Sequence, residues 1–161
     1  MKTILCISGS LRSESKNSVI LKKLQEQFKG SIELHIYKEL DLLPHFNPDK
    51  ENEPNTYLSN YKNLLSSADA VLISTPEYAH GIPGSLKNAL DWVVGSGELI
   101  DKKIGLIFSS SSDASFVKTQ LAEVLRTMSA RVQEADCIKI SGTELSPEIL
   151  RLIERLIYQL S

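Results

Sequence analysis

The feature that most constrains this fold is the stretch of residues 70–97. It begins with the apolar run Ala70–Ile73, which is typical of a strand that helices cover on both faces of a parallel sheet. Pro76 ends the strand because proline has no N–H to donate, and a polar loop follows. After Pro83, apolar residues recur three and four apart and predict a helix that ends at Gly95–Gly97. This order predicts a ligand site at the carboxyl edge of an α/β sheet.

A second polar loop, Ser8–Ser18, follows the apolar run Thr3–Ile7 and leads into a helix. The first N–H groups of a helix are unpaired and attract anions, and the guanidinium of Arg12 can pair with phosphate oxygens. The residues alone leave two interpretations open. The loop either binds a phosphate or is a plain polar turn with Ser15 or Asn17 as the N-cap. It matches neither a Walker A loop nor a GxGxxG turn.

The stretch of residues 70–97 also resembles the signature of the NAD(P)H-dependent FMN reductase family. The resemblance rests on Pro76-Glu77-Tyr78, on Pro83-Gly84 and on Leu86-Lys87-Asn88-Ala89-Leu90-Asp91-Trp92. It covers most of the chain, because Gly9-Ser10-Leu11-Arg12 with Ser15, Asn17 and Ser18 looks like the phosphate loop of that family. Two places depart from the family pattern. Ala79 replaces the usual Asn, and Ser109–Ser115 lacks the usual glycines, without which a backbone approaches a ring less easily.

The resemblance implies a bound FMN, with NADPH or NADH as co-substrate. It implies that the phosphate contacts Ser10, Arg12, Ser15, Asn17 and Ser18. It implies that the ring contacts the loop made of Pro76, Glu77, Tyr78, Ala79, His80 and Gly81, chiefly through exposed N–H groups. The hydroxyls of Ser110 and Ser111 are expected near the ribityl chain or the pyrimidine edge, although Ser112, Asp113 or Ser115 could simply cap the next helix.

The implied activity is that of an FMN-dependent oxidoreductase. Hydride would pass from NAD(P)H through FMN to a small acceptor such as a flavin, a quinone, an azo or nitro compound, or a metal ion. No catalytic side chain is expected, because the cofactor carries the chemistry. Glu77 is expected to brace its loop, while His80 either touches the ring or acceptor or is solvated. Members of the family are commonly oligomeric, so a homodimer or homotetramer is expected.

Five apolar runs of strand length alternate with five helical patterns over residues 1–161. This alternation predicts a single α/β domain, with three layers around a doubly wound, five-stranded parallel sheet. The flavodoxin-like order 2-1-3-4-5 places the switch point between the first and third strands, where the two richest loops would flank a crevice. The remaining strands are expected at Ile32–Tyr37, Lys103–Phe108 and Cys137–Ile140.

Composition excludes several other classes. A net charge of −2 and a pI near 5.9 argue against a nucleic-acid surface. No run approaches the roughly 20 apolar residues of a membrane span, and Met1-Lys2 leads into a strand without a signal-peptide pattern. The two cysteines, Cys6 and Cys137, lie in apolar runs and are expected to be buried free thiols rather than metal ligands. A cytoplasmic, metal-free protein without a membrane partner is expected.

Three competing classes share the predicted fold. One is a degenerate member of the family that has lost FMN, an alternative that the glycine-free Ser109–Ser115 loop leaves open. A flavodoxin-like electron carrier, or an FMN-binding protein without reductase activity, would bind the same cofactor. Carriers of that type are usually strongly acidic where they dock, whereas this chain is nearly balanced. A receiver domain would need clustered acids after the first strand, and the Ser8–Ser18 loop contains only Glu14.

Overall fold

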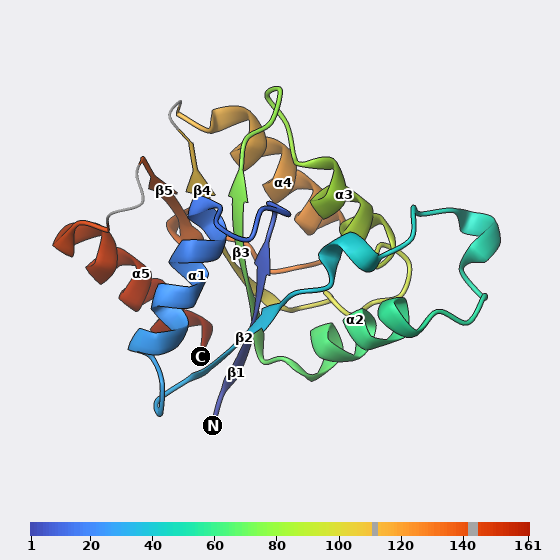
Figure 1. Cartoon of the computed structure of the whole chain (residues 1–161), viewed down its shortest axis with the longest axis horizontal. Coiled ribbons are helices and arrows are strands. Elements are labelled where there is room, and N and C mark those ends of the chain that lie inside the picture. Colours follow the sequence, from blue (N-terminus) through green and yellow to red (C-terminus); the bar gives the residue numbers. More distant parts are fainter. Residues whose placement is uncertain (111–112, 142–144) are drawn as a thin grey trace.

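The computed structural model describes residues 1–110, 113–141 and 145–161. Within these residues, the core of the protein is a parallel sheet of five strands in the order β2-β1-β3-β4-β5 (Figure 1). The predicted flavodoxin-like order 2-1-3-4-5 is therefore confirmed. The strands are β1 (Thr3–Ser8), β2 (Glu33–Tyr37), β3 (Ala70–Pro76), β4 (Lys103–Ser109) and β5 (Cys137–Ile140).

Helices cover both faces of the sheet and complete three layers (Figure 1). One face packs against α1 and α5, and the other against α2, α3 and α4. All seven residues of β3 are buried, as its unbroken apolar run predicts. The helices are α1 (Lys16–Gln27), α2 (Thr56–Ser67), α3 (Gly84–Asp91), α4 (Ser115–Thr127) and α5 (Pro147–Leu160).

Side-chain caps fix the start of three helices. Ser15, Asn55 and Ser146 each accept a hydrogen bond from the backbone N–H three residues later, at 3.1, 2.9 and 3.2 Å. Such a cap satisfies one of the unpaired N–H groups in the first helical turn. In α3 the expected end at Gly95–Gly97 is wrong, because the helix stops at Asp91 and residues 92–96 form turns.

The long connection between β2 and α2 contains two short 3₁₀ helices, Leu40–Leu42 and Pro48–Lys50. Residues of α3 and of the turn after it attach this connection to the domain. The Pro44 carbonyl accepts hydrogen bonds from Asn88 Nδ2 at 2.9 Å and from Trp92 Nε1 at 2.7 Å. Asn88 Oδ1 also accepts from the N–H of Phe46 at 2.8 Å. These two residues of the family signature therefore act in packing.

The two cysteines differ in their surroundings, and neither forms a disulfide. Cys6 is fully buried, and burial raises the pKa of its thiol to about 12, so it stays protonated. Cys137 is only half-buried, which corrects the expectation of a second fully buried thiol. Cys137 is the first residue of β5, which lies at the edge of the sheet and has one neighbouring strand. Cys6 lies in β1, which has a neighbouring strand on each side.

Gly9 marks the point where the sheet changes its winding direction. Its N–H donates to the Ser74 carbonyl at 2.8 Å, which extends the pairing of β1 with β3 by one residue. A β-carbon at this position would lie 2.3 Å from Thr75 Oγ1 and 2.7 Å from Thr75 Cβ. Only glycine therefore allows β1 and β3 to approach this closely where the first loop begins.

We expect Gly9→Ala to lower the free energy of unfolding by about 1–3 kcal/mol, because the added methyl group overpacks a rigid site. Urea denaturation followed by circular dichroism measures the change. Gly84→Ala is the matched control, since nothing lies within 4 Å of a β-carbon placed at that position. Equal effects of the two substitutions would contradict the close packing of Gly9.

Candidate active site

Three loops follow strands at the carboxyl edge of the sheet, namely β1, β3 and β4 (Figure 1). They are named here loop 1 (residues 9–15), loop 3 (residues 77–83) and loop 4, of which the structure describes residues 110, 113 and 114. The strand ends are in register, because Ser8 pairs with Ser74 and Pro76 pairs with Ser109. The topology thus brings together the loops that the sequence indicated, beside the predicted switch point.

Loop 1 is held by a network of serine hydroxyls. Ser8 Oγ lies 3.0 Å from the Ser10 carbonyl and 3.2 Å from Ser18 Oγ. Ser15 Oγ lies 2.9 Å from Ser18 Oγ while it caps α1. The N-cap interpretation of Ser15 is therefore correct, and the same network leaves Ser10 and Ser15 buried.

Loop 1 and the first turn of α1 also present hydrogen-bond donors that have no partner among the described residues. The buried Asn17 accepts from Ser74 Oγ at 3.0 Å through Oδ1, and its Nδ2 makes no hydrogen bond to any described residue. The Arg12 side chain is exposed and likewise makes no bond to a described residue, and the backbone N–H groups of residues 11–14 are equally unpaired there. Unpaired N–H donors at the start of a helix, beside a guanidinium, suit an anion.

Loop 3 closes in a tight two-residue turn. Tyr78 N–H donates to the Gly81 carbonyl at 3.1 Å, and Gly81 N–H donates to the Tyr78 carbonyl at 2.9 Å. Ala79 and His80 have φ values of 48° and 58°, so two non-glycine residues occupy the left-handed region that a type I′ turn requires. The N–H groups of Tyr78 and Gly81 are bonded within the turn. Of the backbone N–H groups in this turn that were expected to donate to the flavin ring, those of Ala79 and His80 are left.

Glu77 connects loop 3 to α4. Its Oε2 accepts from the N–H of Val117, in the first turn of α4, at 3.1 Å. The N-cap residue of α4, Ala114, has φ 58° and provides no side-chain cap, so the carboxylate substitutes for one. The prediction that Glu77 braces its loop agrees with this contact. The side chain of Glu77 is only 6% exposed, and its Oε1 lies 3.7 Å from His80 Nδ1.

Loop 4 contributes less to the described site. Ser110 N–H donates to the Ile140 carbonyl at 3.2 Å, while Ser111 lies outside the described residues. Asp113 accepts from both the N–H and the hydroxyl of Ser115, and these bonds, the backbone bond first, lower the pKa of its carboxyl. The alternative that Asp113 supports the start of α4 is therefore the better interpretation of its role.

Two cavities adjoin these loops. The loop-1 cavity, of about 440 Å³, lies between loop 1, α1 and the end of β2. It is lined by the cations Arg12, Lys22 and Lys38 and by the single acid Asp41, so its potential favours an anion. The outer groove, of about 530 Å³, lies between Tyr78 of loop 3 and Gln120 of α4.

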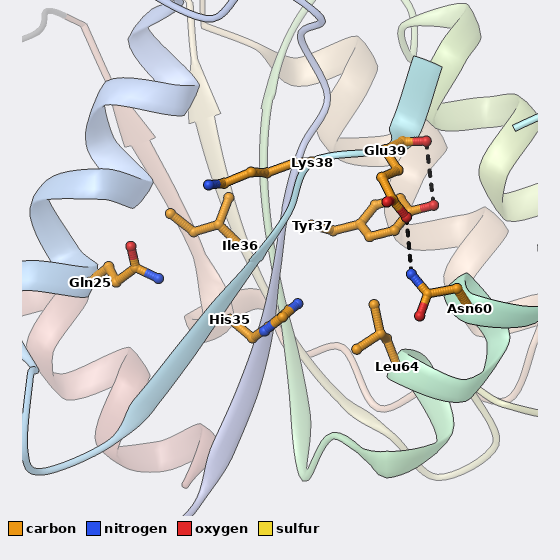
Figure 2. A pocket seen from close by; sticks show the side chains of 8 residues that line it. All are labelled: Gln25, His35, Ile36, Tyr37, Lys38, Glu39, Asn60 and Leu64. Carbon is orange, nitrogen blue, oxygen red and sulfur yellow. Dashed lines mark hydrogen bonds between the residues drawn. The ribbon is translucent and has the colours of Figure 1, made fainter. Parts of the chain in front are cut away.

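A third cavity, of about 420 Å³, lies at the free edge of β2 between α1 and α2, and Figure 2 shows its lining. Its polar groups mostly bond to one another. Asn60 Nδ2 donates to Glu39 Oε2 at 2.9 Å, and Tyr37 Oη donates to the Glu39 carbonyl at 3.4 Å. Gln25 Nε2 donates to the Leu34 carbonyl at 2.6 Å. We interpret this cavity as a groove along the sheet edge, separate from the three loops.

Two contacts of the site were not expected from the sequence. Ser74 in β3 holds Asn17, and the exposed ring of Phe116 in α4 lies 4.6 Å from the His80 ring, measured between centroids. Ser74 sits inside an apolar run, and a hydroxyl in such a run is a signal that could have been followed. Phe46 lies beside α3, because its N–H donates to Asn88 Oδ1 and its ring packs edge-on against Trp92 at 5.1 Å.

Two kinds of feature are absent from the described part of the chain. No helix there is long and apolar enough to cross a membrane. Nor do three or more His, Cys, Asp or Glu side chains gather there in a group that could hold a metal ion.

A doubly wound five-stranded parallel sheet in the order 2-1-3-4-5 defines the flavodoxin-like fold. Residues 2–143 match the model of the family described as NADPH-dependent FMN reductase. The chain therefore belongs to the NADPH-dependent FMN reductase family, and the predicted family, fold and enzyme class are confirmed.

Individual relatives agree with this assignment. An NADH-dependent flavin reductase subunit 2 from Lactobacillus johnsonii is 30% identical over 129 residues, which cover 76% of this chain and 68% of that protein. A quinone reductase from Pseudomonas putida is 41% identical over 96 residues, covering 58% of this chain and 50% of that protein, about half its length. The structure of FerB, a flavoenzyme NAD(P)H:(acceptor) oxidoreductase from Paracoccus denitrificans, has a TM-score of 0.75 at 25% identity, covering 99% of this chain and 93% of FerB.

We expect Ala79→Asn to raise the free energy of unfolding by about 0.5–1 kcal/mol, because Asn tolerates the left-handed conformation better than Ala. Thermal and urea unfolding of the two proteins measure the difference. Ala79→Val serves as the opposite control, since a β-branched side chain is strained at positive φ and should destabilise the protein. A stabilising Val or a destabilising Asn would contradict the turn described for loop 3.

Proposed function

We propose that the protein transfers hydride from NADPH or NADH, through FMN bound at loops 1, 3 and 4, to a small electron acceptor. The observation that carries the proposal is the set of unpaired donors in loop 1, next to the switch point of the sheet. Family membership supports FMN as the cofactor. When bound, FMN supplies the two-electron chemistry that no described side chain supplies.

In this proposal loop 1 and the start of α1 would hold the FMN phosphate. Arg12 would pair with it, the Asn17 amide and the N–H groups of residues 11–14 would donate to it, and the α1 dipole would favour its charge. Ser10, Ser15 and Ser18 hold the loop through the hydroxyl network and can turn their hydroxyls toward the ligand.

In this proposal loop 3 would hold the flavin ring. The N–H groups of Ala79 and His80 would donate to its polar edge, and the exposed side chain of Tyr78 would pack against it. Pro76 and Gly81 shape the loop on either side, while Glu77 fixes it to α4. The role of the side chains is thus to hold the ring with one face open to the second substrate.

The acceptor and the assembly are also part of the proposal. The names of relatives point to flavins and quinones, so we propose a planar acceptor of one of these classes. The site is exposed, and two large apolar side chains, Tyr78 and Phe116, are 53% and 52% accessible beside it. We propose that a second copy of the chain covers them in a homodimer or homotetramer. A cytoplasmic location is proposed on the sequence expectation alone.

We expect Arg12→Ala to weaken FMN binding by about 10- to 100-fold, because a charged hydrogen bond to phosphate is lost. Binding of riboflavin, which has no phosphate, should hardly change. Quenching of flavin fluorescence during titration measures both affinities. Arg151→Ala, an exposed position on α5, is the control.

Three outcomes would count against this assignment. Equal losses of FMN and riboflavin affinity in the Arg12→Ala protein would exclude the phosphate contact. A parent protein that binds no FMN at tens of micromolar would contradict the reductase and favour a degenerate or unrelated protein. A parent protein that binds FMN but is not bleached by NAD(P)H under nitrogen would favour an electron carrier.

A further inference from the structure

His80 stands in an unusual setting for an exposed loop histidine. Its side chain is 72% accessible, yet the ring rests 4.6 Å from the Phe116 ring at an interplanar angle of 57°. Its backbone is held at φ 58°, and its carbonyl accepts from Gln120 Nε2 at 3.2 Å. The imidazole is therefore positioned by contacts from both loop 3 and α4, rather than moving freely in solvent.

The carboxylate of Glu77 lies beside the Nδ1 edge of this imidazole. Glu77 Oε1 lies 3.7 Å from His80 Nδ1, and the other oxygen of Glu77 is fixed by the N–H of Val117. The carboxylate therefore lies on the Nδ1 side of the ring and orients that nitrogen toward loop 3. The other nitrogen, Nε2, has no hydrogen-bond partner among the described residues and is left for an external group.

The other contacts that His80 makes with described residues bring no charged group against it. The residues of α4 that touch it, Phe116 and Gln120, are uncharged. Lys87 of α3 and Glu123 of α4 line the outer groove beside loop 3 and carry opposite charges. Within the described residues, Glu77 is the charged group in direct contact with the ring.

We propose that His80 is the proton donor to a reduced quinone-type acceptor, and that Glu77 is the residue that positions it. This inference rests on the function proposed above. A quinone that receives hydride, and with it two electrons, becomes a hydroquinone monoanion. The Nε2–H bond of the imidazolium then breaks, its proton moves to the phenolate oxygen, and neutral hydroquinone forms. The neutral imidazole keeps its Nδ1–H toward Glu77 and regains the lost proton from water.

An acceptor that needs no proton separates this role from a structural one. Ferricyanide takes single electrons, so its reduction does not use the proton of His80. His80→Asn keeps a residue that tolerates the left-handed conformation but removes the acid. We expect the ratio of kcat/KM for benzoquinone to kcat/KM for ferricyanide to fall by about tenfold or more. His35→Gln, on the exposed edge of β2, should leave the ratio unchanged.

The positioning role of Glu77 is tested by the same ratio. Glu77→Gln should also lower it, and the Glu77→Gln/His80→Asn double variant should lower it no further than His80→Asn alone. A purely structural role of Glu77 would change both acceptors together and leave the ratio at the parent value.

Chemical modification provides a measurement that does not depend on turnover. The FMN-loaded protein is treated with diethyl pyrocarbonate, with and without nitrophenolate as an analogue of the hydroquinone anion, and modified histidines are quantified by mass spectrometry. We expect nitrophenolate to slow modification of His80 by about fivefold or more, since a bound anion would occupy Nε2. His35 is exposed and provides the internal control within the same sample.

The outcomes distinguish this inference from the proposed function. An active parent protein whose ratio is unchanged in His80→Asn overturns the role of His80 alone, as does equal modification of His80 with and without nitrophenolate. A parent protein that reduces neither acceptor with FMN and NAD(P)H overturns the proposed function, and this inference with it.

Discussion

The structure of the site depends on the close approach of β1 and β3 at Gly9. The N–H of Gly9 bonds to Ser74, and the missing β-carbon lets the chain pass directly against Thr75. One residue before Thr75, Ser74 holds Asn17 at the start of α1. Loop 1 and loop 3 are therefore placed by the same few atoms, so the position of the phosphate donors and that of the ring-binding turn are mechanically linked.

Most of the fold could be predicted from the sequence, because its signals are local. Buried strands such as β3 appear as unbroken apolar runs, and helix caps such as Ser146-Pro147 follow from the needs of the first turn. The end of α3 was not predictable in this way. The apolar spacing continues beyond Asp91, but the chain forms turns there, in which Trp92 reaches across to the Pro44 carbonyl.

The candidate site was predictable in its location but not in its internal bonding. The order of strands and loops placed loops 1, 3 and 4 at one edge, because parallel strands end together. The sequence did not reveal that the N–H groups of Tyr78 and Gly81 donate to each other's carbonyls, or that Glu77 caps α4. Both depend on the backbone conformation at Ala79 and Ala114. These two alanines have positive φ values, which non-glycine residues rarely adopt.

The groove at the edge of β2 has a consequence for how copies of the chain can meet. The N–H of Glu33 donates to the Lys2 carbonyl, on the side of β2 that faces β1. Successive residues of a strand point their backbone groups to opposite sides, so the carbonyl of the next residue, Leu34, points to the free edge of the sheet. Gln25 already donates to that carbonyl, and His35, Lys38 and Glu39 place polar and charged groups along the groove at the same edge. A strand from another molecule would have to displace this amide and desolvate these groups, so the exposed edge is protected against continuing the sheet from one molecule to the next.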